Sequence, residues 1–422
     1  MKSVVSRQDS GVSVGNYPEH RSEIEMSRVD SMSAGSRGFR AKVLLLISNL
    51  EYGGAQRQVV ELANRLNAEG TETFVCTLSD HVPLACKLDN QSRVLHVIQK
   101  RCKFDISVVG RLRRLVEGLN VDIIHAFLLD AEIAGRLAGR RLHGVAMMGS
   151  ERNADHEYKW RHTAALRLTA RWFDAIIANS NAGRRFQIRT LSIASDKVFV
   201  VHNGVDVVRF APRPKGDLGE PLGIPADAPV VAMFCSFKRQ KNHAMFFRMA
   251  KRVLESRPEA MFLCVGGRLH GGLQGTDTYH RQMLNLVEAL GLSGRVLFLG
   301  NRDDVVDLYN LCDATVLTSK REGTPNVLLE SMACGVPVVT TDVADNALIV
   351  PDGHAGYVVP YDDDAAMADR VLHILSDEGA RRLMGSAARK WVAREFSMAS
   401  LVQKTLAVYD EVLQRKRAEA RV

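Results

Sequence analysis

The chain lacks any long hydrophobic run. No stretch of its 422 residues approaches the roughly 20 consecutive apolar residues that a membrane-spanning helix needs. Its start, Met1–Gln8, has no apolar core of the kind found in signal peptides. With 46% hydrophobic and 25% charged residues, the composition predicts a soluble, cytoplasmic protein that is long enough for two α/β domains.

The cysteines and aromatic residues do not indicate a metal site or a nucleic-acid-binding module. The seven cysteines are scattered without metal-ligand spacing, and Cys76, Cys235 and Cys264 stand in apolar runs, which indicates reduced core residues. Aromatic residues make up only 6% of the chain and no recognition module is visible, so nucleic acid is not the expected partner. Neither a G-x-G-x-x-G fingerprint nor a P-loop is present.

The positive charge lies in the first half of the chain. Residues 1–210 contain 30 Lys and Arg against 22 Asp and Glu, whereas residues 211–422 contain 26 of each. The first half also contains a cluster of arginines, namely Arg111, Arg113, Arg114, Arg136, Arg140 and Arg141. This excess fits an anionic membrane surface or an anionic acceptor, and it fits solvated helix faces equally well.

Short apolar runs alternate with helical patterns, which predicts parallel βαβ units. Residues 1–40 have no hydrophobic period and are expected to form a disordered tail. Prolines and glycines between 212 and 219 mark a linker, which divides the chain into domains 41–212 and 213–395. Residues 396–422 are expected to form a C-terminal helix that crosses back to the first domain.

Polar residues follow two expected strands of the first domain. His125 ends the strand 121–125, and Arg152 follows the strand 145–148. Open α/β sheets place ligand residues at the carboxyl ends of their strands. Both residues are therefore candidates for a site, although a histidine at a strand end and an arginine paired with an acid are common without one.

Residues 313–341 contain a strand, a loop, a helix and a second strand. Ala314–Leu317 predicts the first strand. Thr324 is a suitable N-cap and Pro325 suits the first helical position. Gly335 is expected to end the helix. The segment therefore predicts a βαβ unit.

The start of this helix has the chemistry of an anion site. Pro325 has no N–H, so the free amides belong to Asn326 and Val327, and the helix dipole adds to them. Glu322 and Glu330 flank these amides and could accept hydrogen bonds from ligand hydroxyls. A phosphate between two such carboxylates suggests a nucleotide sugar. The spacing is equally compatible with one surface glutamate and one helix glutamate without a ligand.

Two further loops could contact the same ligand. Gly53 and Gly54 follow the first strand and lead into a helix, where backbone can approach a ligand closely. Lys238, Arg239 and Lys241 lie on a loop between a strand and a helix in the second domain. Such a loop can hold a leaving phosphate, or it can carry three solvated bases.

The segment Glu322-Gly-Thr-Pro-Asn-Val-Leu-Leu-Glu330, followed by Gly-Val-Pro-Val-Val, resembles the E-x7-E signature of family 4 retaining glycosyltransferases. Residues 203–212 also resemble the family's N-G-V-D-x-x-x-F-x-P segment, and the resemblance covers about residues 42–410. It implies the GT-B architecture, in which two Rossmann-like, doubly wound parallel-sheet domains face each other across a cleft.

The resemblance implies transfer of a sugar from a UDP- or GDP-sugar to a glycan or lipid-linked glycan, with retention of configuration. It also implies a role in surface or exopolysaccharide synthesis and no obligatory metal or other cofactor. The first domain would bind the acceptor and the second the donor. The residues implied are Glu322, Lys241 and His125 for catalysis; Gly53, Gly54, Lys238, Arg239, Gly266, Gly323, Thr324, Asn326, Val327, Leu328 and Glu330 for the donor; and Gln56 and Arg152 for the acceptor.

Three positions depart from the family pattern. Phe127 replaces one histidine of an expected Asp-x-x-His-x-His run, Ser236 stands where an arginine is usual, and Leu348 lies in a divergent segment. A nucleotide-sugar epimerase or a catalytically impaired nucleotide-sugar-binding protein are therefore the alternatives. Asp362–Asp364 contains a D-x-D pattern, but it begins an expected helix, where carboxylates are favoured without a metal.

Overall fold

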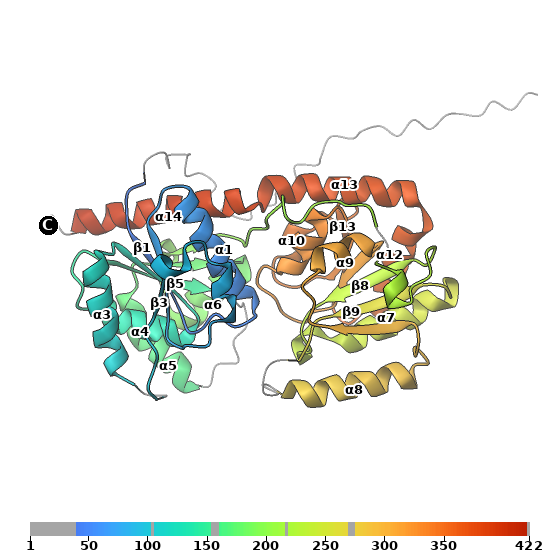
Figure 1. Ribbon diagram of the computed structural model, residues 1–422, viewed down its shortest axis with the longest axis horizontal. Helices are drawn as coiled ribbons and strands as arrows, with labels where there is room; N and C mark the ends of the chain where they lie inside the picture. The colour runs from blue at the N-terminus through green and yellow to red at the C-terminus, as the bar shows by residue number, and fades with distance from the viewer. Residues whose placement is uncertain (1–38, 103–104, 153–159, 216–217, 269–274, 420–422) are drawn as a thin grey trace, which may run out of the picture.

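The computed structural model describes residues 39–102, 105–152, 160–215, 218–268 and 275–419. Its two α/β units lie side by side along the longest axis of the molecule (Figure 1). The first contains a seven-stranded sheet in the order β3-β2-β1-β4-β5-β6-β7, and the second a six-stranded sheet in the order β10-β9-β8-β11-β12-β13. Every strand pair is parallel, as the alternating pattern predicts. The expected tail, residues 1–40, lies outside the described residues except for its last two.

The first sheet separates two helical layers. Alternate residues of β1 point to opposite faces, so Leu45 packs towards α1 and α14 while Leu44 packs towards α3 and α4. The strands are β1 (Val43–Ile47), β2 (Thr73–Thr77), β3 (Leu95–Val97), β4 (Ile123–Phe127), β5 (Ala146–Glu151), β6 (Ala175–Ala178) and β7 (Val198–Val200). The helices are α1 (Gly54–Ala68), α2 (Gln91–Val94), α3 (Ser107–Leu119), α4 (Leu129–Gly139), α5 (Trp160–Thr169) and α6 (Asn181–Leu191).

The second sheet is enclosed in the same way. Ala232 of β8 packs towards α9, α10 and α13, and Val231 packs towards α7, α8 and α12. The strands are β8 (Val230–Phe234), β9 (Met261–Val265), β10 (Val296–Gly300), β11 (Ala314–Leu317), β12 (Val338–Thr341) and β13 (Gly356–Val359). The helices are α7 (His243–Ser256), α8 (Thr276–Ala289), α9 (Val305–Leu311), α10 (Asn326–Ala333), α11 (Asn346–Ile349), α12 (Asp364–Ser376) and α13 (Glu378–Glu395).

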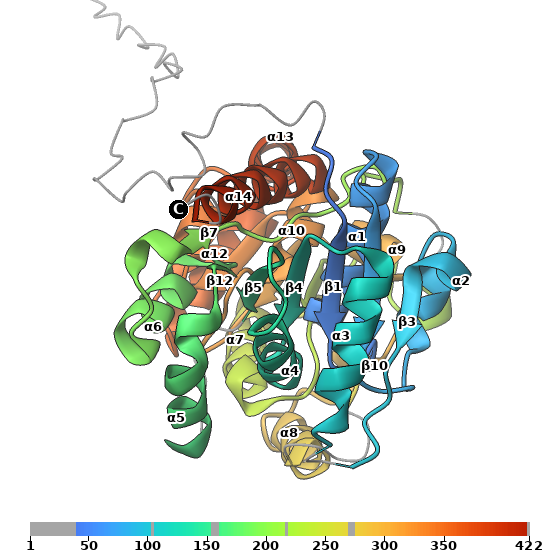
Figure 2. The ribbon, with the colours of Figure 1, turned by 90° about the vertical axis from the view of Figure 1, so that its left-hand side faces the viewer.

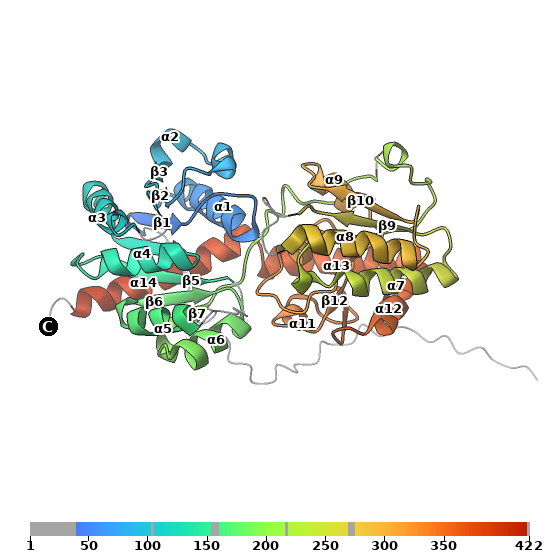
Figure 3. The ribbon, with the colours of Figure 1, turned by 90° about the horizontal axis from the view of Figure 1, so that it is seen from below.

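The chain passes between the two units twice, and the two passages lie together. Val205 donates to the carbonyl of Phe396 at 2.8 Å and accepts from Met398 at 3.0 Å. After this point α14 (Met398–Glu419) lies along the first unit, where Tyr409 and its neighbours enter the core (Figure 2). Seen from below, α13 and α14 follow one another across both units (Figure 3).

Two local predictions were wrong. The helix after Glu322 begins at Asn326 with Pro325 as its N-cap, so Thr324 is not the cap. The strand expected to end near Met148 continues to Glu151, which is buried.

Candidate functional site

Lys241 and Glu322 form an ion pair at the carboxyl ends of β8 and β11. The Lys241 ammonium donates to Glu322 Oε1, and the Ser319 hydroxyl donates to the same oxygen at 2.5 Å. Burial disfavours the charged lysine, but the negative charge of Glu322, its hydrogen bond and the influence of Cys235 together outweigh burial, so the pKa of Lys241 is raised. Both side chains are largely buried, so the pair is a fixed pair of charges beside the loop that leads into α10.

The start of α10 lies between the two domains. Asn326 and Val327 have no carbonyl four residues earlier within the helix, so their amides are available to a ligand, as the sequence predicts. The amide of Leu328 donates to the carbonyl of Pro325 at 3.2 Å, so its predicted contact with the donor is not supported. Leu328 itself is a core residue.

Thr324 and Gly323 contact the first domain. The Thr324 hydroxyl donates to the carbonyl of Asn179, which explains why it does not cap α10. A Cβ at Gly323 would lie 2.4 Å from the Asn179 side chain, so a larger residue would force Asn179 to shift. The two residues therefore bring the domains together beside Glu322, and in this structure they act as interface residues.

Asn203 joins the domains at a second point. Its side chain donates to the carbonyl of Thr324 at 3.0 Å and to Asn326 Oδ1 at 2.7 Å. It also accepts from Arg152 at 2.9 Å. Arg152, predicted to bind the acceptor, is thus linked to the start of α10 through Asn203. Burial lowers the pKa of Arg152 to about 10. Its charge is retained at neutral pH.

Gly53 and Gly54 face the second domain. Gly53 is the N-cap of α1, and a Cβ on Gly54 would lie 3.6 Å from the Asn326 side chain. The Gln56 amide folds back over Gly53 and donates to Asn49 at 3.1 Å. The structure therefore brings together these three predicted residues and the start of α10.

The basic loop of the second domain divides into two parts. Lys238 lies near Lys241, and burial together with the Lys241 charge lowers its pKa. Arg239 turns away, donates to Gln282 of α8 at 3.1 Å and stands over the Tyr279 ring. Arg239 is therefore separated from the other two bases, contrary to its predicted role in holding the donor.

Gly266 has a structural role. Its φ is 139°, and a Cβ would lie 2.1 Å from the Cys235 carbonyl oxygen. It ends β9 at a point where only glycine fits between the sheet and the loop that carries Lys238. Residues 269–274, which follow shortly after Gly266, lie outside the described residues.

His125 is not positioned for catalysis. The strand β4 continues two residues beyond it, and its ring is fully buried, 2.7 Å from the Tyr409 hydroxyl of α14. Burial, together with the charge of Arg152, holds the pKa of His125 well below its usual range. A neutral imidazole without exposed surface cannot contact a substrate, so this prediction was wrong. His125 instead anchors the C-terminal helix.

Glu330 is bonded to one residue from each domain. Its Oε1 accepts from Arg57 of α1 at 2.8 Å, and its Oε2 accepts from the Tyr309 hydroxyl of α9 at 2.9 Å. Neither partner was predicted from the sequence. Arg57 is three residues after Gly54. Because the glycine pair was expected to lie near α10, Arg57 could have been expected near α10 as well.

Another contact between the domains also escaped prediction. Asp345 Oδ2 accepts from the Asn181 amide at 2.7 Å and contacts His202 Nε2 at 2.8 Å. Burial opposes the ionised form, but the bonds from His202 and Asn181 outweigh it and lower the pKa of Asp345. This carboxylate belongs to the segment that diverges from the family pattern, so the pattern gave no reason to select it.

The three aspartates of the D-x-D pattern bind protein groups. Asp363 caps α12 by accepting from the amide of Ala366 at 2.9 Å. Asp362 binds Arg248 at 2.7 Å, and Asp364 binds Arg248 and Arg252. The expected position at a helix start is confirmed. Within the described ranges, no three His, Cys, Asp or Glu side chains gather in a group that could hold a metal ion.

The predicted arginine cluster is divided between paired and exposed side chains. Arg136 is buried against Glu132, Arg111 binds Asp105, and Arg113 donates to carbonyls at the end of α4. Arg114, Arg140 and Arg141 are exposed. Half of the cluster therefore stabilises the fold, and the remainder is available at the surface.

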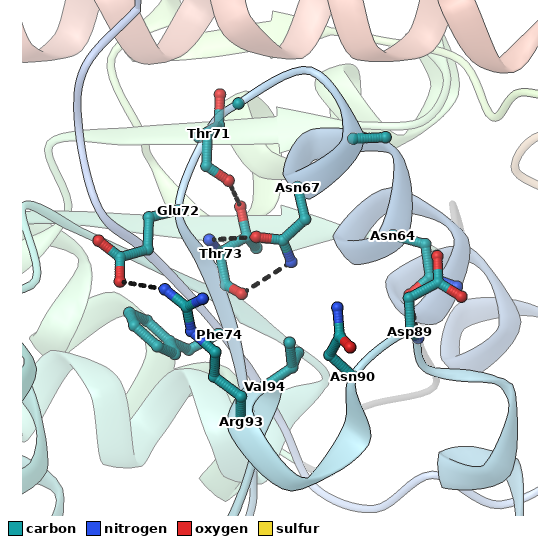
Figure 4. A pocket seen from close by; sticks show the side chains of 12 residues that line it. Asn64, Asn67, Thr71, Glu72, Thr73, Phe74, Asp89, Asn90, Arg93 and Val94 are labelled. Atoms are coloured by element: carbon teal, nitrogen blue, oxygen red, sulfur yellow. Dashed lines mark hydrogen bonds and ion pairs between the residues drawn. The ribbon is translucent and has the colours of Figure 1, made fainter.

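A separate hollow of about 460 Å³ lies on the first domain between the end of α1, the start of β2 and α2 (Figure 4). Its polar groups largely bond to each other: Asn67 to the backbone of Thr73, and Arg93 to Glu72. Because the 15 residues of α1 span about 22 Å, this hollow is remote from Gly53 and the facing domain.

The two facing Rossmann-like domains define a GT-B glycosyltransferase. The family described as glycosyltransferase family 4 matches residues 52–209, and that described as glycosyl transferases group 1 matches residues 216–391. The two matches leave only a six-residue gap between them. The chain therefore belongs to the group 1, family 4 glycosyltransferases, as the E-x7-E pattern indicates.

Individual relatives agree with this class. The chain is 27% identical to a UDP-Gal:α-D-GlcNAc-diphosphoundecaprenol α-1,3-galactosyltransferase of Escherichia coli, over 74% of this chain and 81% of the relative. It is 26% identical to an N-acetyl-α-D-glucosaminyl L-malate synthase of Bacillus anthracis, over 74% and 80%. Its fold matches Anabaena HepE in complex with UDP with a TM-score of 0.77 at 21% identity, covering 88% of this chain and all of that one. In the parts that the structure describes, no helix is long and apolar enough to span a membrane.

Proposed function

We propose that the protein transfers a sugar from a nucleoside diphosphate sugar to a glycan or lipid-linked glycan acceptor. The observation that carries this proposal is the Lys241–Glu322 pair beside the start of α10, with Gly53 and Gly54 facing it from the other domain. Lys241 and the amides of Asn326 and Val327 offer positive charge to a diphosphate. The names of relatives such as the UDP-Gal-dependent enzyme support a nucleotide-sugar donor.

In this proposal the carboxylates bind the two polyols of the donor. Glu322 accepts from hydroxyls of the sugar, and Glu330 accepts from those of the ribose. The diphosphate lies between them, at Lys241 and the start of α10. Lys238 adds charge beside Lys241, while Gln56 and Arg152 lie on the side where the first domain would bind the acceptor.

We further propose that transfer retains the anomeric configuration. Glu322 is held by Lys241 and Ser319, which suits a group that orients the sugar rather than one that attacks it. An acceptor hydroxyl then attacks from the face that the diphosphate leaves. The bond from the anomeric carbon to the phosphate oxygen breaks, the acceptor oxygen bonds to that carbon, and its proton passes to the departing phosphate. Lys241 neutralises the charge that develops.

A panel of UDP- and GDP-sugars, measured by thermal shift, tests the donor assignment. A ligand that binds the folded state raises the melting temperature, so one base and one sugar should stand out. Conversion of that donor without an acceptor, yielding an epimer, would instead indicate a nucleotide-sugar epimerase. Binding with neither conversion nor transfer would indicate a catalytically impaired binding protein.

We expect transfer to continue in the presence of EDTA. Lys241, Lys238 and the dipole of α10 supply the positive charge that a divalent cation provides in other transferases. The measurement compares initial rates in untreated enzyme, in EDTA, and in EDTA followed by excess Mg²⁺ or Mn²⁺. Complete loss in EDTA with recovery on adding metal would contradict a metal-free mechanism.

We also propose that the enzyme works at an anionic membrane surface, where a lipid-linked acceptor resides, in surface polysaccharide synthesis. The supporting feature is a surface patch formed by the residues just after α4, by α5 and by the turn that follows α5. Its members are Arg140, Arg141, Arg167, Leu168 and Arg171, which are exposed, and Trp172, which is half-buried. Leu168 is 74% exposed, and the guanidinium groups of Arg140 and Arg171 stand over the Trp172 ring. No acidic residue occurs in 133–150 or 158–173. Each arginine near such a surface contributes about 1 kcal/mol.

The triple change Arg140→Ser, Leu168→Ser and Arg171→Ser should reduce binding to phosphatidylglycerol vesicles by at least about tenfold. Co-sedimentation with those vesicles, compared with pure phosphatidylcholine, measures this effect. The matched control is Arg382→Ser with Leu383→Ser, which removes an exposed arginine and a 75% exposed leucine from α13 of the other domain. Equal binding by wild type and the triple variant would contradict the patch.

A further inference from the structure

Glu330 is held by one residue from each domain. Tyr309, from α9 of the second domain, is itself fixed because its buried ring stacks on Phe234 at 3.9 Å. Arg57, from α1 of the first domain, supplies the other hydrogen bond, and its charge is partly exposed while Glu330 is largely buried. The orientation of this carboxylate thus depends on the contact between the domains.

The bonding capacity of Glu330 is only half used. An ionised carboxylate offers about four acceptor sites, two on each oxygen. Arg57 occupies one site on Oε1, and Tyr309 occupies one site on Oε2. One site remains on each oxygen, and the two hydroxyls of a vicinal diol, such as the 2′- and 3′-hydroxyls of ribose, have the number and spacing to fill them.

A second carboxylate competes weakly for Arg57. Glu61 lies one turn further along α1, and burial raises its pKa to about 7 in spite of the nearby Arg57. It is therefore only partly ionised at neutral pH, which leaves Glu330 as the stronger partner. A hollow of about 300 Å³ borders Arg57 and Glu61, so the guanidinium has room to move when its bond to Glu330 breaks.

We propose that Arg57 is a positioning residue that completes the ribose-binding carboxylate from the opposite domain, so that nucleotide binding favours the contact between the domains. The inference rests on the proposed function, in which Glu330 accepts from the ribose hydroxyls. Without Arg57, only Tyr309 would orient Glu330. The carboxylate would then lose the alignment that lets it bond two hydroxyls at once, and the nucleotide would no longer draw α1 towards α10.

The test measures calorimetric dissociation constants for UDP and GDP and for their 2′-deoxy analogues. For whichever base binds, wild type should prefer the ribonucleotide by at least about tenfold, because a buried charged acceptor loses one hydrogen bond in the deoxy complex. Arg57→Gln should weaken the ribonucleotide by at least about tenfold and reduce the preference below about threefold. Arg57→Lys, which keeps the charge, should recover part of both.

Two further variants separate the ways in which the result can fail. Glu330→Gln should abolish the ribose preference; if it does not, or if wild type has no preference, Glu330 does not bind ribose and both the assignment and the inference fall. If Glu330→Gln behaves as expected but Arg57→Gln keeps the full preference, only the inference is overturned. Arg65→Gln is the control. Arg65 lies on the same helix as Arg57, and the substitution breaks only a surface ion pair with Asp206, so this variant should match wild type. If Arg57→Gln does not fold, Arg57→Lys carries the test alone, and an undiminished preference in it overturns the inference.

Discussion

Replacing Glu322 by glutamine should reduce the rate of sugar transfer by about 10²-fold or more. The substitution preserves size but removes the negative charge that fixes Lys241 and that accepts from Ser319. A neutral amide presents an N–H where the proposed sugar hydroxyl needs an acceptor, so one good hydrogen bond becomes a repulsive contact. The loss should fall on kcat, because in the proposed mechanism Glu322 orients the reacting sugar, while nucleoside diphosphate binding should change little.

Steady-state kinetics with the donor identified by thermal shift measure this effect. Glu378→Gln is the matched control, because Glu378 is an exposed glutamate of the same domain that binds only Arg382. Both proteins should show wild-type circular dichroism. Near-wild-type turnover by folded Glu322→Gln would remove Glu322 from the active site.

Replacing Lys241 by alanine should also lower transfer by about 10²-fold or more. The ammonium remains charged at neutral pH because Glu322 raises its pKa, so it can neutralise the leaving diphosphate throughout the reaction. Its removal also leaves Glu322 largely buried without its cation, which lowers the stability of the protein. Lys241→Gln keeps a donor towards Glu322 and separates lost catalysis from lost stability.

Lys251→Ala is the control for Lys241, since Lys251 is an exposed lysine on α7, the helix that follows. The double variant Glu322→Gln with Lys241→Ala gives a further check. Residues that act as a unit are non-additive, so the double variant should be hardly slower than either single one. Losses that multiply would show that Lys241 and Glu322 act independently.

The order of elements could be predicted because it depends on local pattern. Alternating apolar runs and helical periods predict both parallel sheets, and β11 has the predicted bounds. The proximity of Lys241 and Glu322 depends instead on two neighbouring strands, β8 and β11, ending at the same edge of one sheet. The family resemblance implies that Lys241 and Glu322 belong to one site, although it does not give the order of the strands.

The wrong predictions for His125 and Thr324 share one physical cause, which is a partner far away in the sequence. His125 is covered by Tyr409, 284 residues later, and the Thr324 hydroxyl is bound to a carbonyl 145 residues earlier. Arg57 escaped prediction because its partner, Glu330, is 273 residues away. Periodicity and capping rules describe neighbours in the chain, so they cannot detect a contact that forms only when two domains meet.

The most direct test of the account is acceptor-dependent release of nucleoside diphosphate. Purified protein is incubated with the donor found by thermal shift, with and without glycan and lipid-linked glycan acceptors, and free UDP or GDP is measured beside the glycosylated product. The account predicts equal amounts of nucleotide and product, only when acceptor is present, and loss of both in Glu322→Gln. Nucleotide release that does not depend on acceptor, or a glycosylated product formed equally well by Glu322→Gln, would contradict it.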